Sequence, residues 1–206
     1  MSDVLPMPAR KPLLEVRNLV TEFPLRTGVF RAVNDLSFTI DAGKTLCVVG
    51  ESGSGKSVTA RSILQIVDAP GHIASGAIML NTADGVSIDL AKLHPRSKAI
   101  RAVRGRDIAM IFQEPMSSLS PVHTVGDQIT EALRLHMKMS KAEARAEAIS
   151  LLRQVEIPNP EQAIDRYAFQ YSGGMRQRAM IAMALACKPK LLITDEPTTA
   201  LDVTTQ

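Results

Sequence analysis

The sequence predicts an α/β fold with a core of parallel strands, an antiparallel β sub-domain and a helical sub-domain. Three short apolar runs, at residues 46–49, 108–112 and 191–194, each lead into a glycine or a polar side chain. Buried parallel strands read as continuous apolar runs, and open α/β sheets hold ligands at the carboxyl ends of such strands. Ahead of the first run the apolar residues alternate with polar ones, and residues 125–156 place them at helical spacing. We therefore expect a ligand site where the apolar runs end.

The composition is that of an ordinary globular domain. Of the 206 residues 45% are apolar, which is enough to fill a core. The formal net charge is +3 with scattered basic residues, and the 3% of aromatic residues include no tryptophan, so no nucleic-acid partner is expected. The sequence shows neither a secretory signal nor an apolar run of about 18 residues, so we do not expect the chain to enter or span a membrane. Cys47 and Cys187 sit far apart in apolar surroundings, which favours buried, reduced thiols and a cytosolic compartment.

The antiparallel sub-domain is predicted from the start of the chain. Residues 1–12 are rich in proline and are expected to form a mobile N-terminal segment. Residues 13–19 and 32–40 alternate apolar and polar side chains, so we predict two antiparallel strands that lead into the run at 46–49. Phe23 lies between them, and its ring could stack on an adenine base, although a strand phenylalanine more often packs in a core.

A glycine-rich loop follows the first apolar run and opens a helical pattern. Glycines at 50, 53 and 55 permit backbone angles that a Cβ would forbid, so successive N–H groups can form a concave anion nest. Lys56 can reach the β and γ phosphates of a nucleotide, and the Ser57 hydroxyl is placed to bind Mg²⁺. A chance glycine-rich turn is the alternative. The predicted phosphate-binding residues are Gly50, Glu51, Ser52, Gly53, Ser54, Gly55, Lys56 and Ser57.

The middle of the chain predicts a hairpin and then helices. Residues 76–80 and 86–90 flank an Asp-Gly turn, and the basic residues 94–106 are most simply a solvated helix face. Ser140 is a plausible helix N-cap, and Glu143 completes a capping box with it.

Two further motifs carry chemistry. The run at 191–194 ends in Asp195 and Glu196, and carboxylates after a buried strand need a cation or a task. Asp195 would hold Mg²⁺, and Glu196 would orient or deprotonate the water that attacks the γ-phosphate; a simple cap of the next turn is the alternative. Gln113 ends the run at 108–112, where an amide alone is a weak signal.

Ser172, Gly173 and Gly174 precede another long helical pattern. Taken alone, they form an N-cap and a turn. They also repeat the anion-site logic of the glycine-rich loop, with a hydroxyl, unencumbered backbone amides and a helix N-terminus. Two phosphate sites in a chain with one glycine-rich loop suggest that the second site serves a nucleotide on another subunit.

This ordered set of motifs resembles the ATP-binding subunit of an ABC transporter, and its finer residues are similar to the peptide and nickel importer branch, which includes dipeptide, oligopeptide and glutathione importers. The matching motifs are residues 50–57 (Walker A), Gln113 (Q-loop), residues 171–175 (signature), residues 191–196 (Walker B) and residues 200–202 (D-loop).

The resemblance implies a head-to-tail pair of ATPase subunits that sandwich two ATP molecules with Mg²⁺. The nucleotide pocket of the partner subunit would then be completed by residues 172–174, Met175 and Asp202. Phe23 becomes the adenine-stacking ring, with Phe30 second. Gln113 would sense Mg²⁺ and the attacking water, and residues 114–121 would lie against integral membrane permease subunits at the cytoplasmic face of the inner membrane. A periplasmic or extracellular solute-binding protein would take part indirectly.

Some residues depart from the family pattern. Tyr171 stands where leucine is usual and Met175 where many members have glutamine, while Ser120 replaces an asparagine and Thr194 adds a hydroxyl. No histidine follows residue 196, so we expect an N-terminal fragment: an incomplete ATP-binding domain over 13–206, with a helical sub-domain at about 113–171. A soluble ABC ATPase of DNA repair or translation, and a truncated module that binds ATP without turnover, stay as alternatives.

Overall fold

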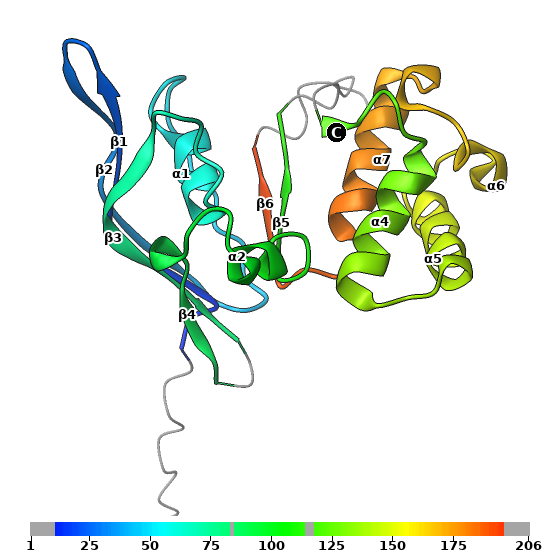
Figure 1. Cartoon of the computed structure of the whole chain (residues 1–206), viewed down its shortest axis with the longest axis horizontal. Helices are drawn as coiled ribbons and strands as arrows, with labels where there is room; N and C mark the ends of the chain where they lie inside the picture. The colour runs from blue at the N-terminus through cyan, green and yellow to red at the C-terminus, as the bar shows by residue number, and fades with distance from the viewer. Residues whose placement is uncertain (1–10, 83–84, 114–117, 196–206) are drawn as a thin grey trace, which may run out of the picture. The chain divides into compact units, whose positions relative to one another are not determined.

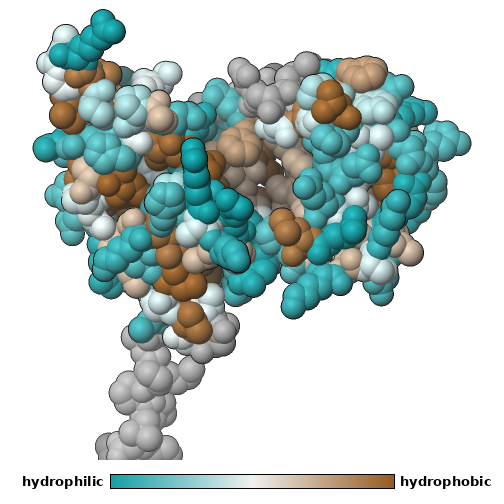
Figure 2. Space-filling model, in the orientation of Figure 1, coloured by the Kyte–Doolittle hydropathy of each residue, from teal (hydrophilic) through white to brown (hydrophobic). Residues whose placement is uncertain are grey.

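The computed structural model describes residues 11–82, 85–113 and 118–195, and the chain divides into two compact units, Met1–Pro95 and Arg96–Gln206 (Figure 1). Each unit contains both strands and helices. Apolar side chains also reach the surface of both units (Figure 2), among them Val49 in the first and Phe169 in the second. Within the described residues, no helix has the length and apolar character needed to cross a lipid bilayer.

The first unit is an antiparallel sheet covered by a short helix. Its strands lie in the order β2-β1-β3-β4. The elements are β1 (Leu14–Leu25), β2 (Gly28–Ile40), α1 (Lys56–Ile63), β3 (His72–Asn81), β4 (Ser87–Asp89) and the 3₁₀ turn η1 (Leu90–Lys92). The predicted pairing of the two N-terminal strands is confirmed, and so is the hairpin, in which Asn81 lies opposite Ser87. The first two strands run farther toward their shared turn than the alternation indicated, which brings Phe23 opposite Phe30.

The helix α1 is fixed on this sheet by apolar packing and by one buried polar contact. Leu14, Leu19 and Ile78 are fully buried, and Ile63 joins this core from the helix. The hydroxyls of Thr21 on β1 and Ser62 on α1 lie 2.9 Å apart, and both residues are buried. A buried hydrogen bond of this kind is costly to leave unmade, so it helps to hold the last turn of the helix against the sheet.

The prediction of a buried strand at residues 46–49 was wrong. This segment is irregular and exposed: Leu46 is 43%, Val48 54% and Val49 89% accessible. An apolar run becomes a strand only when a neighbouring strand pairs with its backbone groups. In the described chain, neither of the two sheets includes this segment. The prediction that Cys47 is a buried thiol fails for the same reason, since that cysteine is exposed.

The second unit contains a parallel strand pair. Its strands are β5 (Ile108–Ile111) and β6 (Leu191–Thr194), with Ile111 opposite Thr194. Both strands begin where the apolar runs predicted. The expectation that both are buried holds for β5, whereas β6 is buried only at Leu191, and Leu192 is 37% accessible. Thr194 is also exposed, so the polar residue at the end of this apolar strand is accessible to water.

Helices make up the rest of the second unit. They are α2 (Lys98–Val103), α4 (Val125–Met137), α5 (Lys141–Gln154), α6 (Pro160–Ala163), the 3₁₀ turn η2 (Ala168–Gln170) and α7 (Gly173–Leu185). The predicted capping box is present: Ser140 Oγ accepts from Glu143 N, and the Glu143 carboxylate accepts from Ser140 N. The basic stretch predicted as a helix face at 94–106 is helical only over α2, in which Ile100 and Val103 are buried and the basic side chains are exposed.

The helix α7 packs with two different faces. Ala179 and Ala182 belong to the core shared with α4 and α5, while Met180 and Ala184 pack with Ala109 and Ile111 of β5. Small residues allow neighbouring elements to approach closely on both sides. A single helix therefore ties the helical core to the parallel strands within this unit.

Candidate functional site

The glycine-rich loop adopts a conformation that only glycine tolerates at its two inner positions. Gly53 has φ +81° and Gly55 has φ +90°, both in the left-handed region. A Cβ built on Gly55 would lie 2.2 Å from the carbonyl oxygen of Ala32 on β2, a backbone atom that cannot move aside cheaply. At Gly55 the loop therefore packs against the sheet with no room for a side chain. Residues 50–57 are hereafter called the P-loop.

The first turn of α1 is open to a ligand. Gly55 is the N-cap, and because it has no side chain it forms no side-chain cap with the first turn of the helix. Backbone amides at a helix N-terminus and the helix dipole together favour an anion at this end. The first turn contains no acidic residue. Thr59 strengthens the start of the helix, since its backbone N–H and its hydroxyl both donate to Gly55 O, at 2.8 and 2.9 Å.

Lys56 brings a positive charge to the same place. Its Nζ donates to the carbonyl oxygens of Gly50 at 2.7 Å and Glu51 at 2.8 Å. The lysine side chain thus folds back over the loop that precedes it and holds the ammonium there. Glycine backbone, amides at a helix N-terminus and a fixed ammonium are the donors that a phosphate group needs, so these residues fit the phosphates of a nucleotide.

The other P-loop side chains are arranged around this turn. Glu51, Ser52 and Ser54 are exposed, and Ser54 N donates to Glu51 O at 3.2 Å, which closes a tight turn. Ser57, the predicted Mg²⁺ ligand, is half-buried in the first turn of α1. The sequence therefore brings all eight predicted phosphate-loop residues together in one turn and the helix start that follows it.

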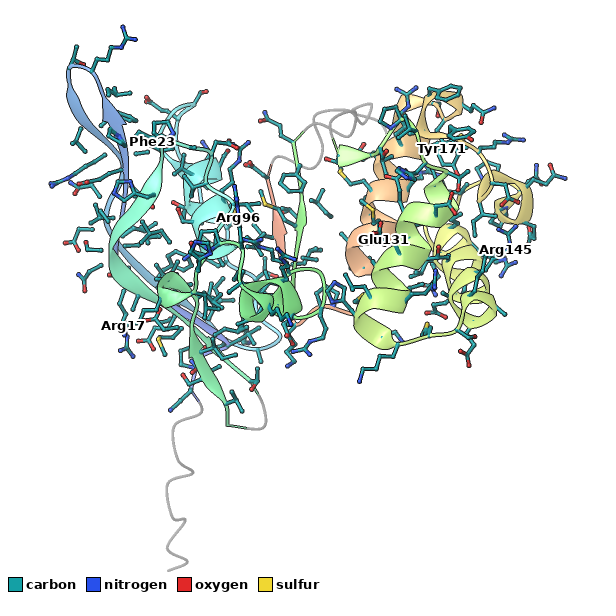
Figure 3. All side chains as sticks on the ribbon, in the orientation of Figure 1. Arg17, Phe23, Arg96, Glu131, Arg145 and Tyr171 are labelled. Carbon is teal, nitrogen blue, oxygen red and sulfur yellow. The ribbon has the colours of Figure 1, made fainter. Side chains whose placement is uncertain are left out.

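Phe23 lies half-buried on β1, near the hairpin end of that strand (Figure 3). A Cβ on Gly71 would meet the Phe23 ring at 2.4 Å, so the edge of this ring packs directly on the glycine. Its cross-strand partner Phe30 is 54% accessible. Part of the Phe23 ring thus packs in the protein, as the core-packing interpretation predicts. Stacking of Phe23 on adenine stays a prediction.

Gln113 and Asp195 follow neighbouring parallel strands. The backbone N–H of Asp195 donates to Ile111 O at 3.0 Å, which extends the pairing of β6 with β5 by one residue. Gln113 follows Ile111 by two residues and is exposed. The two predicted Mg²⁺ ligands of the second unit are therefore at the same edge of the strand pair. Glu196 and Asp202 lie outside the described residues, within which no three His, Cys, Asp or Glu side chains gather as a metal site.

The helix tip of residues 172–174, hereafter the α7 tip, has an ordinary cap and bare glycines. Ser172 is the N-cap, and its Oγ accepts from Met175 N at 3.3 Å, as the capping interpretation predicts. A serine hydroxyl that accepts still has a proton to donate. Among the described residues, Cβ atoms built on Gly173 and Gly174 would meet no atom within 4 Å. The anion-binding interpretation of this tip stays a prediction.

Tyr171 is a site residue whose role the sequence did not reveal. It is 2% accessible, and its hydroxyl donates to Ala163 O at 2.9 Å. Burial raises the pKa of Tyr171 to about 12, so the phenol stays protonated and able to donate throughout the neutral range. The only signal in the sequence was the departure from leucine, which does not say what a buried hydroxyl would bind.

The second cysteine behaves as predicted. Cys187 is buried, and its thiol lies 3.6 Å from Ala132 O, to which it donates. Burial raises the pKa of this thiol. The neutral thiol is the unreactive form, so Cys187 has a packing role between α7 and α4.

Comparison with known proteins identifies the family. Residues 33–199 match the family profile described as ABC transporter, which is well over half of the chain. The chain belongs to the ABC transporter family. Its relatives include the glutathione import ATP-binding protein GsiA of Pectobacterium atrosepticum, 51% identical over all of this chain and 33% of that protein. A candidate peptide import ATP-binding protein of Brucella melitensis is 50% identical over 96% of this chain and 58% of that protein. The chain thus spans between about one third and three fifths of the length of these ABC relatives.

Solved structures confirm the fold class. The dimeric structure of MJ0796, a bacterial ABC transporter cassette, superimposes with a TM-score of 0.79 at 26% identity and covers 93% of this chain and 77% of that one. A post-hydrolysis state of the same ATP-binding cassette, bound to ADP and Pi, gives the same TM-score at 25% identity. The α/β core with an antiparallel β sub-domain and a helical sub-domain, predicted from the motifs, is that of the ABC ATPase cassette.

Proposed function

We propose that the chain is the ATP-binding and ATP-hydrolysing subunit of an ABC importer for peptides or related small solutes such as glutathione. The observation that carries the proposal is the P-loop geometry: a glycine turn that ends at the glycine N-cap of a helix, with the Lys56 ammonium folded over it. A family member with this geometry is equipped to bind nucleotide phosphates. The import functions named for relatives at about half identity support the transport role.

The residues divide the chemistry between them. Amides at the start of α1 and Lys56 would bind the β and γ phosphates. Ser57 in the first unit, and Asp195 and Gln113 in the second, would each serve as ligands for Mg²⁺. Bound Mg²⁺ neutralises charge on the phosphoryl group that is transferred. Glu196 accepts a proton from the attacking water, and Phe23 stacks on the adenine base with Phe30 as the second choice.

Two copies, or this chain and a related subunit, complete each pocket. The nucleotide pocket on the partner's P-loop is completed by the α7 tip, Met175 and Asp202. The bare backbone at Gly173 and Gly174 supports this assignment, because amide groups without nearby side chains can approach a phosphate held by another molecule. The dimeric state of the MJ0796 cassette supports it as well.

The membrane partners follow from the importer role. The subunit is peripheral at the cytoplasmic face of the inner membrane and binds integral permease subunits through residues 114–121, part of which lies outside the described residues. A solute-binding protein outside the cytoplasmic membrane delivers the solute to the permease. ATP hydrolysis by the subunit then drives the transport cycle.

Phosphate release from ATP by the purified protein tests the proposal. We expect Mg²⁺-dependent turnover that is lost in Lys56→Ala, which removes the ammonium, and in Glu196→Gln, which retains ATP binding. Lys92→Ala is a matched control, because this lysine pairs with Asp89 on the surface of the same unit. Turnover no higher than background in the unchanged protein would reduce it to an ATP-binding module, and turnover that survives Lys56→Ala would contradict the assigned site.

A further inference from the structure

We infer that Tyr171 is a positioning residue of the signature motif: its hydroxyl fixes the α7 tip to the segment at residues 163–166, and so sets where that tip meets the partner's nucleotide. The inference rests on the proposed function, since it gives Tyr171 a task in a pocket that two subunits share. Tyr171 lies among the helices of the second unit, next to the start of α7 (Figure 3).

The α7 tip depends on its neighbours in sequence for its position. Ser172 and Gly173 are exposed, and a Cβ at Gly173 or Gly174 would have no atom within 4 Å. The residue just before them is the opposite: Tyr171 is 2% accessible, with its backbone N–H donating to Ala168 O at 3.1 Å and its hydroxyl to Ala163 O at 2.9 Å. The residue that immediately precedes the exposed tip is thus anchored by a buried side chain.

The acceptor of this hydroxyl belongs to a firmly held segment. Ala163 and Ile164 are fully buried. The first amides of α4 donate to the segment, Gly126 N to Ile164 O at 2.8 Å and Val125 N to Arg166 O at 2.9 Å. A Cβ on Gly126 would come within 2.3 Å of an Ile164 side-chain carbon, so helix and segment are in direct contact.

Two ion pairs hold the same stretch from the α5 side. Arg145 of α5 forms a bidentate pair with Asp165, at 2.7 and 2.8 Å (Figure 3), and Arg153 pairs with Glu161. Exposed pairs of this kind add little energy each. Together with the hydrogen bonds from the start of α4, they place the segment to which Tyr171 is bonded against both α4 and α5.

The hydroxyl acts on position more than on stability. Ala163 O also accepts from Arg166 N at 2.9 Å, so that oxygen stays paired when the phenol oxygen is removed. The Arg176 guanidinium donates to Ala168 O at 2.7 Å and to Phe169 O at 3.2 Å, and keeps the preceding turn closed. Phenylalanine or leucine at 171 would still fill the apolar space, yet neither could reach Ala163 O. Such variants should fold with a tip that is less well placed.

The test uses the full chain carrying Glu196→Gln, which should associate in ATP without turning it over. We compare it with the same chain carrying Tyr171→Phe as well, by sedimentation with ATP and by binding of a fluorescent ATP analogue to the monomer. The expected result is an association constant about three- to tenfold weaker, the range of one neutral hydrogen bond, with monomer nucleotide affinity unchanged. Tyr167→Phe is the matched control, since Tyr167 is 39% accessible and precedes the tip by five residues.

Tyr171→Leu should weaken association as much as Tyr171→Phe, because both lack the hydroxyl. In the chain that retains Glu196, we expect Tyr171→Phe to lower kcat with KM for ATP unchanged. A role in packing alone would lower the unfolding temperature and leave association unchanged, and that result would overturn the inference. If the parent chain does not associate in ATP at all, the proposed function fails instead, so the two failures are distinguishable.

Discussion

Two helices of this chain begin with glycines, and their first turns are built in different ways. The P-loop enters α1 through Gly53 and Gly55 at positive φ, and α1 has no side-chain cap. The α7 tip has a serine cap at Ser172, and its glycines have no neighbouring atoms that would exclude a Cβ. At the start of α1 there is no side-chain cap, and Gly55 has no room for a side chain. At the start of α7 a serine caps the helix, and the glycines have room for a side chain.

This difference shows which glycines the fold itself requires. Position 55 must be glycine because a Cβ there would clash with Ala32 O of the same chain. A substitution at Gly55 therefore lowers the stability of its own subunit. Within the described residues, no atom lies close enough to Gly173 to exclude a side chain there. If function requires a bare backbone there, the reason must lie in a molecule that contacts the tip from outside, and the following predictions use that contrast.

Gly55→Ala should have the largest effect. Its Cβ would lie 2.2 Å from Ala32 O at a φ of +90°, and a left-handed alanine alone costs about 1–3 kcal/mol. We expect a free energy of unfolding lower by at least about 2 kcal/mol and ATP binding below detection, measured by denaturant titration and calorimetry. Gly28→Ala, another positive-φ glycine with no atom near its Cβ, should bind ATP normally. Normal ATP binding by Gly55→Ala would contradict the P-loop account.

Gly173→Asp should abolish ATP-dependent association of two subunits without changing the stability of each subunit. An acidic residue in the first turn suits the helix dipole, so the free energy of unfolding should stay within about 0.5 kcal/mol of the parent. Monomer ATP affinity should also be unchanged. The carboxylate would repel a phosphate on the partner, so ATP-dependent association of the Glu196→Gln chain should disappear in sedimentation. Retained association would show that the α7 tip is only a capped helix start.

Ser172 distinguishes the capping role from the phosphate role. Ser172→Ala should lower the free energy of unfolding by about 1 kcal/mol, the usual cost of an N-cap, and should also weaken association. Ser172→Asn preserves the cap but replaces the hydroxyl. It should keep the parent's unfolding temperature and still associate less well. Equal association by Ser172→Asn and the parent would restrict Ser172 to capping.

Phe23→Leu should have the smallest effect, confined to the first unit. Leucine keeps apolar contact with Gly71 and removes the ring that would stack on adenine. We expect ATP affinity a few-fold lower with triphosphate binding unchanged, measured by competition between the two ligands. Phe30→Leu is the paired variant. A larger loss of ATP affinity in Phe30→Leu than in Phe23→Leu would move the adenine contact to the more exposed ring.

Local signals were enough for much of the fold. The Ser140 capping box and the start of β6 at Leu191 follow from neighbouring residues alone, so the sequence predicted them correctly. Residues 46–49 show the limit, because a strand also needs a pairing partner that is distant in sequence.

In the candidate site, too, the features set by neighbouring residues were predictable and those set by the folded chain were not. The glycine spacing predicted the P-loop turn, which depends on contacts among consecutive residues. It could not predict that Lys56 bonds to Gly50 O and Glu51 O, since side-chain direction depends on the folded loop. The bond from Tyr171 to Ala163 likewise joins elements whose proximity depends on helix packing.

The central claim is that each nucleotide is shared by the P-loop of one subunit and the α7 tip of another. Mixing two inactive Glu196→Gln chains tests it most directly: one carries Lys56→Ala and retains its tip, and the other carries Gly173→Asp and retains its P-loop. Neither should associate alone in ATP. We predict that the mixture forms dimers with one ATP each, because a single complete pocket is restored. A mixture that stays monomeric, while the parent chain dimerises, would contradict the claim.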